Sequence, residues 1–513
     1  MLPLEKSWLV FPRKNYFTTS QQNTTTCYNY KDPIKTGPGQ LFCIRGLSEL
    51  YESVWFMKCS IFDRSHNKIQ GTMFSSVDLR RLIYPLIIEQ VLAITVGMVD
   101  TVMISYAGEA AMSGVSLVDM INNLLINIFA AVATGGAVVI SQYLGCRNKD
   151  MAKRTATQLI TVSVVIAVCF MILSICGNKA ILRLLFGSIE ADVMESASIY
   201  FVISAWSYPF LAVFNACAAI FRSMGNAKLP MKISIGMNLF NAMGNAVLIF
   251  GLNMGAAGAA LSTFAARTLG AIVILVLATK KENEVSVNCR ELILWEKDMV
   301  HRILHIAIPS GVENGIFQMG RVLVVSIIAL FGTAQIAANA VANTLDAMGC
   351  IAGQAMNLAM ITVVGQCMGA GDKEQAVYYT KKLWKITYLI TAVINVIILA
   401  ALPILLKMFA LSEEAYRYAY ILVMIHDGMA IFMWPTSFTL PNALRAAGDV
   451  KYSMFVSIFS MFIFRIIFSV ILGIGLDWGA IGVWIAMVFD WIFRCTMFVL
   501  RFKNGKWLEY KVI

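Results

Sequence analysis

Long apolar runs separated by short polar loops make up the chain from about residue 82 to residue 501. Each run has about 20 residues or more, which is enough for an α-helix to cross a hydrocarbon core about 30 Å thick. The pattern predicts an all-α polytopic membrane protein of twelve spans, at 82–105, 117–144, 157–177, 199–221, 232–251, 256–279, 304–331, 338–366, 384–407, 418–444, 452–474 and 479–501.

Lysine and arginine are distributed unevenly between the loops. One set of alternate loops, together with the C-terminal tail, carries 22 of them, and the other set carries 4. Positively charged loops stay on the cytoplasmic side, so both termini are predicted to be cytoplasmic. The net charge of +11 therefore reflects membrane topology and does not indicate a nucleic-acid partner.

The two halves of the chain repeat each other. A constant shift along the sequence aligns prolines, acids, glycines and loop motifs, namely Pro85 with Pro309, Glu89 with Glu313, Gly108 with Gly332, Gln142 and Gly145 with Gln366 and Gly369, and, one position off, Arg222 with Arg445. An even number of spans in each half makes the repeat parallel. We therefore expect two homologous six-helix bundles, 73–279 and 304–503, joined by a cytoplasmic linker, 280–303, and followed by a tail, 504–513.

The segment 1–72 differs from the rest of the chain in composition. It is polar and aromatic, and it contains neither a run long enough to span nor a signal-peptide pattern. A capped helix start is predicted at 76–81, shortly after Met73. We interpret 1–72 as a disordered leader, and as an artefact of the gene model if Met73 is the native start.

Polar residues inside the spans are the functional candidates, because a carboxylate at membrane depth is costly. They are Glu89, Asp100, Asp119, Asn122, Asn123, Asn238, Asn241, Asn245, Thr263, Glu313 and Gln318. Asn241 and Asn245 are four residues apart and share a helix face. Their carboxamide oxygens suit a hard cation such as Na⁺. Hydrogen bonds between helices are the alternative role. Glu89 and Glu313 are expected to be either functional or hydrated near the cytoplasmic entrance.

Four stretches carry a family resemblance: 85–105, which ends in MVDTVMIS, 139–145, 221–230 (FRSMGNAKLP) and 444–451 (LRAAGDVK). The chain resembles the multidrug and toxic compound extrusion (MATE) family, in its bacterial DinF-like and NorM-like branches. The resemblance implies a V-shaped pair of bundles that exports amphipathic organic cations in exchange for Na⁺ or H⁺. It also implies a first-lobe cation site at Asp100, Asn241, Asn245 and Thr263.

The second half departs from the family pattern. Val324 occupies the repeat position that corresponds to Asp100. Gln318 and Pro435 stand where other members carry acids in helices 7 and 10. The sequence thus places cation coupling in the first lobe and predicts no cation site in the second. Some members have Asp where this chain has Asn245, so the choice between Na⁺ and H⁺ stays open.

The sequence lacks the motifs of several other functions. No GxxxxGK[ST] or HExxH occurs, so neither ATP-driven transport nor a metalloenzyme is indicated, and no cofactor is expected beyond the coupling ion. The cysteines form no CxxC pair, which predicts neither disulfides nor a zinc site. Asp490 and Arg494 are predicted to neutralise each other. Arg321 and Arg465, which have no evident partner, keep a flippase of lipid-linked precursors as the alternative function. We expect a monomer in the bacterial inner membrane.

Overall fold

The computed structural model describes residues 72–187, 190–292, 294–409 and 411–513, which belong to one structural unit. These residues form helices joined by short loops and contain no strand. The predicted leader lies outside the described residues, apart from residue 72.

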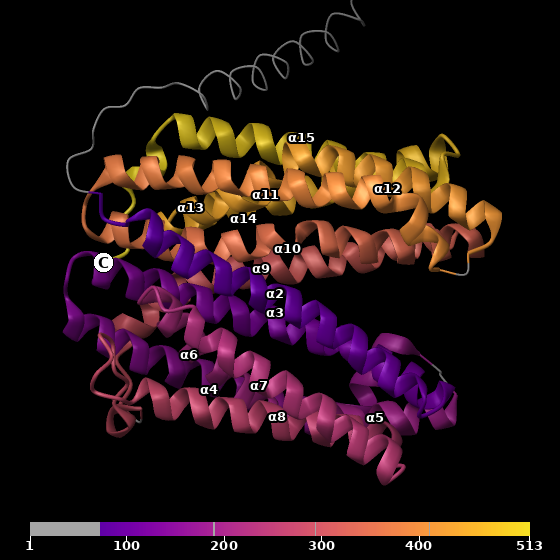
Figure 1. Ribbon diagram of the computed structural model, residues 1–513, viewed down its shortest axis with the longest axis horizontal. Helices are drawn as coiled ribbons and strands as arrows, with labels where there is room; N and C mark the ends of the chain where they lie inside the picture. The colour runs from indigo at the N-terminus through magenta and orange to yellow at the C-terminus, as the bar shows by residue number, and fades with distance from the viewer. Residues whose placement is uncertain (1–71, 188–189, 293, 410) are drawn as a thin grey trace, which may run out of the picture. The chain divides into compact units, whose positions relative to one another are not determined.

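The first lobe is built from the helices that precede residue 279 (Figure 1). In chain order they are α2 (Ser76–Ser105), α3 (Glu109–Gly145), α4 (Lys149–Phe186), α5 (Ala191–Trp206), α6 (Tyr208–Ser223), α7 (Lys228–Asn245) with the π-helical extension η1 (Ala246–Gly251), and α8 (Gly255–Ala278).

The second lobe follows a linker that contains the short helix η2 (Cys289–Glu291). It consists of α9 (Lys297–Ala329), α10 (Thr333–Gly369), α11 (Lys373–Lys407), α12 (Glu413–Trp434), the π-helical η3 (Pro435–Thr439), α13 (Leu440–Ala447), α14 (Val450–Ser460), the π-helical η4 (Met461–Ile467) and η5 (Val470–Gly475), and α15 (Gly479–Lys503), before the tail helix η6 (Lys506–Glu509).

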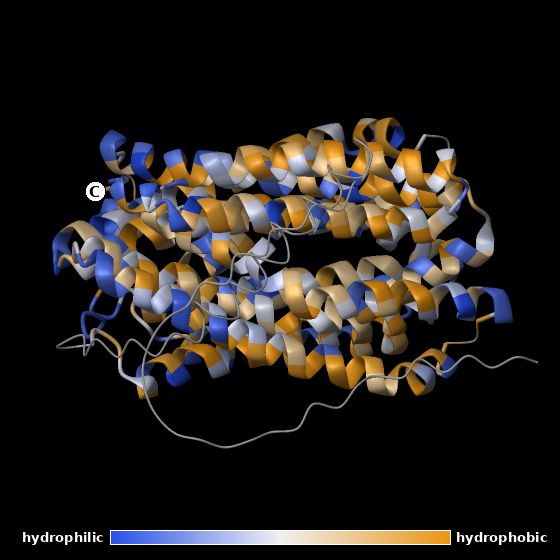
Figure 2. Cartoon of the chain, turned by 90° about the horizontal axis from the view of Figure 1, so that it is seen from above, coloured by the Kyte–Doolittle hydropathy of each residue, from blue (hydrophilic) through white to orange (hydrophobic). Residues whose placement is uncertain are grey.

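The predicted spans are confirmed. Eleven helical segments among the described residues are long and apolar enough to cross a membrane, and the pair α5 and α6 makes twelve. That pair is bent by 46° at Ser207, where Pro209 in the first turn of α6 has no backbone N–H to continue the helix. In Figure 2, hydrophilic residues gather at the helix ends, most densely at the end where the C-terminus lies.

One predicted helix start is confirmed and one boundary differs. The helix α2 begins at Ser76, as predicted, and Ser75 caps it in a capping box with Asp78. The helix α9 begins at Lys297, so the last residues of the predicted linker are helical. The rest of the linker packs on α4, where the Gln158 side chain donates to the Leu294 carbonyl oxygen at 2.6 Å.

The internal repeat extends to the backbone. The π-helical segments η1 and η5 begin at Ala246 and Val470, which the shift between the sequence halves places opposite each other. After each of them comes a residue with positive φ, Asn253 at 52° and Asp477 at 58°. The π-helical segments η3 and η4 have no counterparts among the described residues of the first lobe, so the second lobe carries two extra wide turns.

The lobes meet along several helix pairs, α3 with α9, α2 with α10 and α3 with α10, and the last pair crosses near the C-terminal ends of both helices. A Cβ added at Gly145 would collide with the Gln366 carbonyl oxygen, and one at Gly369 would collide with that of Gln142. The small residues are spaced as SxxxG (141–145) and GxxxG (365–369), the spacing that allows close helix crossing in membranes.

Two reciprocal hydrogen bonds flank this crossing. Gln142 of the first lobe donates to the Ala446 carbonyl oxygen at 2.8 Å, and Gln366 of the second donates to that of Ser223 at 2.7 Å. The two donors, Gln142 and Gln366, are thus repeat mates, and so are the two acceptors, Ser223 and Ala446. The repeated glutamine motif therefore joins the two lobes.

Candidate functional site

Asp100 lies on α2 opposite the end of α7. Its Oδ1 accepts a hydrogen bond of 2.8 Å from Nδ2 of Asn245. One turn earlier on α7, Nδ2 of Asn241 donates to Oγ1 of Thr263 on α8 at 3.2 Å. The structure therefore gathers the four residues proposed for cation binding from three helices of the first lobe.

Two oxygen atoms at this place have no partner. The side-chain Oδ1 atoms of Asn241 and Asn245 are buried and accept no hydrogen bond from any described residue. A buried acceptor without a donor costs free energy, and a bound cation would remove that cost. The π-helical η1 begins directly after Asn245, and such wide turns often occur at functional sites.

A second carboxylate lies on α3. Asp119 Oδ1 accepts from the side chains of Asn122 at 3.2 Å and Tyr200 at 3.3 Å. The Tyr208 hydroxyl donates to Oδ1 of Asn122 at 2.8 Å. The sequence predicted the two α3 residues as polar cavity residues, but it did not single out the tyrosines that α5 and α6 bring to them.

Arg267 is a cation of this region. It lies on α8, donates to Oγ of Ser207 at the bend at 2.8 Å, and interacts electrostatically with both Asp100 and Asp119. Its role could not be assigned from the sequence. When both carboxylates are ionised, one guanidinium balances only one of them, and a net negative charge lies beside the unpartnered carboxamide oxygens. Such an arrangement is chemically suited to a monovalent cation.

The other predicted cavity residues are not part of this cluster. Asn123 is exposed, and Asn238 and Gln318 are half-buried. Their positions give no support to a role in the first-lobe site.

Glu89 and Glu313 are buried in ion pairs, which contradicts the hydrated role, one of the two that the sequence left open. Glu89 on α2 contacts Arg222 on α6 at 2.5 Å, and Glu313 on α9 contacts Arg445 on α13 at 2.7 Å. Arg494 lies 4.0 Å from the same Glu313 oxygen. The arginines Arg222 and Arg445 belong to the two repeated RxxG loops, so the repeat reproduces the whole ion pair.

Asp490 and Arg494 interact electrostatically, as predicted, but each makes its direct contacts with other residues. Asp490 accepts from Ser460 and contacts Arg465 of η4 at 3.5 Å, whereas Arg494 donates to the Ser437 carbonyl oxygen at 3.3 Å. Residues four apart on α15 share a face, but each found a partner on a neighbouring helix.

The second lobe holds carboxylates that the sequence prediction missed. Asp346 on α10 and Asp427 on α12 both contact the ring of His426. Asp427 and His426 are buried and lie in the interior of the lobe.

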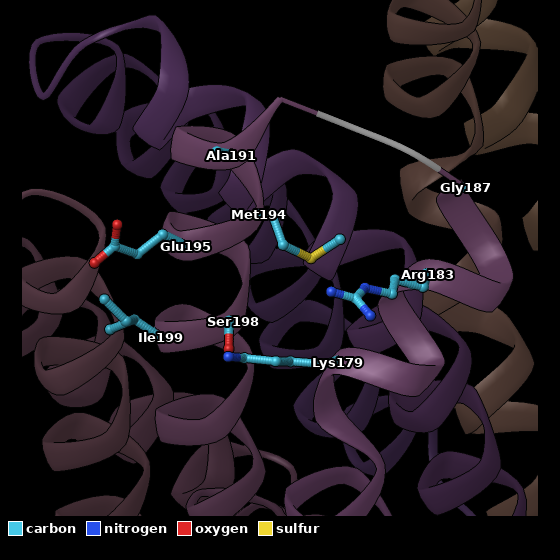
Figure 3. Close-up of a pocket in the computed structure, with 8 residues that line it drawn as sticks. All are labelled: Lys179, Arg183, Gly187, Ala191, Met194, Glu195, Ser198 and Ile199. Atoms are coloured by element: carbon cyan, nitrogen blue, oxygen red, sulfur yellow. The ribbon is translucent and has the colours of Figure 1, made fainter.

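A cavity of about 850 Å³ lies away from these groups, between the facing ends of α4 and α5. Lys179 and Arg183 line it from α4, and Glu195 and Ser198 line it from α5 (Figure 3). None of the predicted site residues contributes to its described walls. We assign it no function.

Comparison with known sequences relates both halves of the chain to one family. Residues 85–247 and 309–471 each match the MatE family, one copy in each lobe. An uncharacterised transporter, YisQ of Bacillus subtilis, is 27% identical over 435 residues, which cover 83% of this chain and 94% of that protein. A probable multidrug resistance protein, NorM of Thermotoga maritima, is 25% identical, covering 85% and 94%.

Solved structures share the fold. A MOP superfamily transporter from Pyrococcus furiosus superposes with a TM-score of 0.79 at 19% identity, covering 85% of this chain and 96% of that one. A multidrug resistance MATE family transporter in an outward-facing conformation gives 0.77 at 18% identity, covering 84% and 94%.

Proposed function

Because the chain belongs to the MATE family, we propose that it is a secondary active transporter that exports amphipathic organic cations in exchange for Na⁺ or H⁺ across the bacterial inner membrane. The observation that carries this proposal is the set of first-lobe oxygen atoms around Asp100, two of which are buried without a partner. Relatives named as multidrug resistance proteins support the substrate class.

The charges suggest how exchange would work. Arg267 cannot neutralise Asp100 and Asp119 together, so one positive charge is still required. Na⁺ or a proton on Asp100 would supply it, and so would an organic cation. Occupancy by the ion and by the substrate would therefore oppose each other, and a ligand shifts a conformational equilibrium only through such differential affinity.

Counterflow in proteoliposomes tests the proposal. Purified protein is reconstituted without nucleotide, and ethidium movement is measured under separate Na⁺ and H⁺ gradients. Movement driven by either gradient is the expected result, and the effective gradient identifies the coupling ion. A requirement for added ATP, or no response to either gradient, would contradict the proposal.

One observation favours the alternative substrate class. Arg321 and Arg465 line a second-lobe cavity of about 60 Å³ together with Asn339 and Asn343. Guanidinium and carboxamide groups suit a phosphate, as in a lipid-linked precursor. Translocation of a fluorescent lipid pyrophosphate in the same proteoliposomes, without ethidium movement, would support that flippase function and reject the cation exporter.

A further inference from the structure

Three potential metal ligands meet in the second lobe. Asp346 and Cys350 are one turn apart on α10, and His426 reaches them from α12. Nε2 of His426 lies 2.8 Å from Oδ1 of Asp346, and the Cys350 sulfur lies 3.2 Å from the same oxygen. The three ligand atoms all lie within 4.8 Å of one another.

Neighbouring groups fix the orientation of the His426 ring on the side away from Asp346. Its Nδ1 lies 2.8 Å from Oδ1 of Asp427, and its ring packs edge-on against Trp484 and Trp491, with centroids 5.5 and 4.9 Å away. A carboxylate on the far nitrogen of a histidine is the usual support of a histidine metal ligand, because it sets the ring orientation and raises ligand basicity. The other Asp427 oxygen is buried and accepts no hydrogen bond from the described chain.

We propose that Asp346, Cys350 and His426 form a binding site for a divalent cation of the zinc class. Thiolate, imidazole and carboxylate are the ligands that Zn²⁺ and Co²⁺ take in four-coordinate sites, and water would occupy the fourth position. Cys350 and His426 are buried, whereas the Asp346 side chain is 24% exposed, so the ion would enter past Asp346.

The spacing needs only a small adjustment. Metal–ligand bonds of about 2.0 to 2.3 Å at tetrahedral angles put ligand atoms roughly 3.5 Å apart. The contacts of 2.8 and 3.2 Å at Asp346 would therefore open by about 0.7 and about 0.3 Å. The present contacts are hydrogen bonds that the metal would replace.

The charges of the proposed ligands are also compatible with a bound divalent cation. Arg321 interacts with Asp346 and opposes a cation, but Cys350 would lose its proton on binding. Thiolate and carboxylate then balance the two positive charges of the metal. The site would link α10 to α12 within the second lobe, and it does not depend on the proposed first-lobe exchange.

Cobalt titration of the purified full-length protein tests the site. After chelator treatment, one equivalent of Co²⁺ should produce near-ultraviolet thiolate charge-transfer bands and visible bands of a tetrahedral ion, and Zn²⁺ should abolish both. Cys350→Ser should remove the charge-transfer band, and Asp346→Asn and His426→Gln should each weaken binding at least tenfold. The control is Cys495→Ser, because that buried second-lobe cysteine contacts Ser437 and the Met433 carbonyl oxygen and its loss should leave Co²⁺ binding normal.

Two results would overturn the proposal. One is the absence of any cobalt band in the unaltered protein, which would leave Asp346, His426 and Asp427 as an ion network that excludes metal. The other is an unchanged charge-transfer band in Cys350→Ser. Because Ser replaces a single atom, that variant should elute as a monodisperse protein even if His426→Gln does not fold.

Discussion

The proposed exchange requires Asp100 to serve a bound ion and a departing substrate with the same oxygen atoms. It is half-buried, and Asn245 donates to one of its oxygens. A carboxylate in this setting depends on its cation far more than one in water does, because the low dielectric strengthens every charge interaction around it. The first prediction therefore concerns its charge alone.

Asp100→Asn keeps the shape and polarity of the side chain and removes the charge. We expect the variant to fold and to lose gradient-driven ethidium counterflow, since Asp119 alone then balances Arg267 and no ion is needed. Asp150→Asn, at an exposed carboxylate on α4, is the matched control and should transport normally. Normal transport by Asp100→Asn at equal expression would show that Asp100 only joins helices.

Asn241 and Asn245 should act as neutral ligands. Replacing either by alanine removes one oxygen from the ion, and an interaction between a neutral group and a charged one contributes about 1.5–3 kcal/mol. Asn245→Ala should therefore raise the concentration of coupling ion needed for half-maximal exchange about tenfold or more, without abolishing exchange. A Na⁺ or pH titration of counterflow measures this change, and an unaltered midpoint would leave Asn245 as a packing residue.

The sequence predicted the carboxylate and carboxamide groups of this site because charge at membrane depth is conspicuous and spacing on one helix reveals a shared face. It could not predict Tyr200 and Tyr208, since a tyrosine in an apolar run becomes a donor to Asp119 or Asn122 only through helix packing. Cys350 and His426 lie far apart in the chain on different helices, so no motif spacing connects them.

At the scale of elements, the repeated ion pairs tie each entry helix to an RxxG loop. Glu89 with Arg222 holds α2 to α6, and Glu313 with Arg445 holds α9 to α13. Removing one partner of a buried pair leaves an uncompensated charge, which costs about 3–5 kcal/mol. The sequence predicted the equivalence of the two acids but not their partners, because each arginine lies several spans further along the chain.

The two pairs should respond differently to the same change. Arg222→Met should lower thermal stability strongly, and Glu89→Gln in the same chain should restore much of it. Arg445→Met should cost less, because Arg494 lies 4.0 Å from the Glu313 oxygen and can take over part of the role. Fluorescence-detected size-exclusion after heating ranks the variants; equal losses for Arg222→Met and Arg445→Met would contradict this assignment.

At the scale of the whole molecule, the sequence predicted each membrane span individually. It did not predict which spans pack together, because apolar residues that face lipid and those that face another helix have the same composition. Gly145 and Gly369 were visible as repeat positions, yet only the crossing of α3 and α10 shows that they lie at a close contact between the lobes.

Topology is predicted from charge and is open to a direct test. Lys149 and Lys373, at the starts of α4 and α11, should be cytoplasmic. Single cysteines placed there, in a variant without other cysteines, should resist an impermeant maleimide in intact cells. A cysteine at Lys407 should react, as the matched control for the opposite face. Labelling at either cytoplasmic position, without labelling at Lys407, would reverse the orientation.

The reciprocal hydrogen bonds of Gln142 and Gln366 have a consequence for how such a chain arises. Two separate copies of a half-length protein would form the same contact twice, as an isologous dimer. Joining the copies preserves that contact and frees each half to vary alone. The two lobes have used that freedom: Asp100 has Val324 as its counterpart, while the second lobe holds a histidine, a thiol and two carboxylates of its own. In a joined chain, two equivalent sites can thus become chemically distinct.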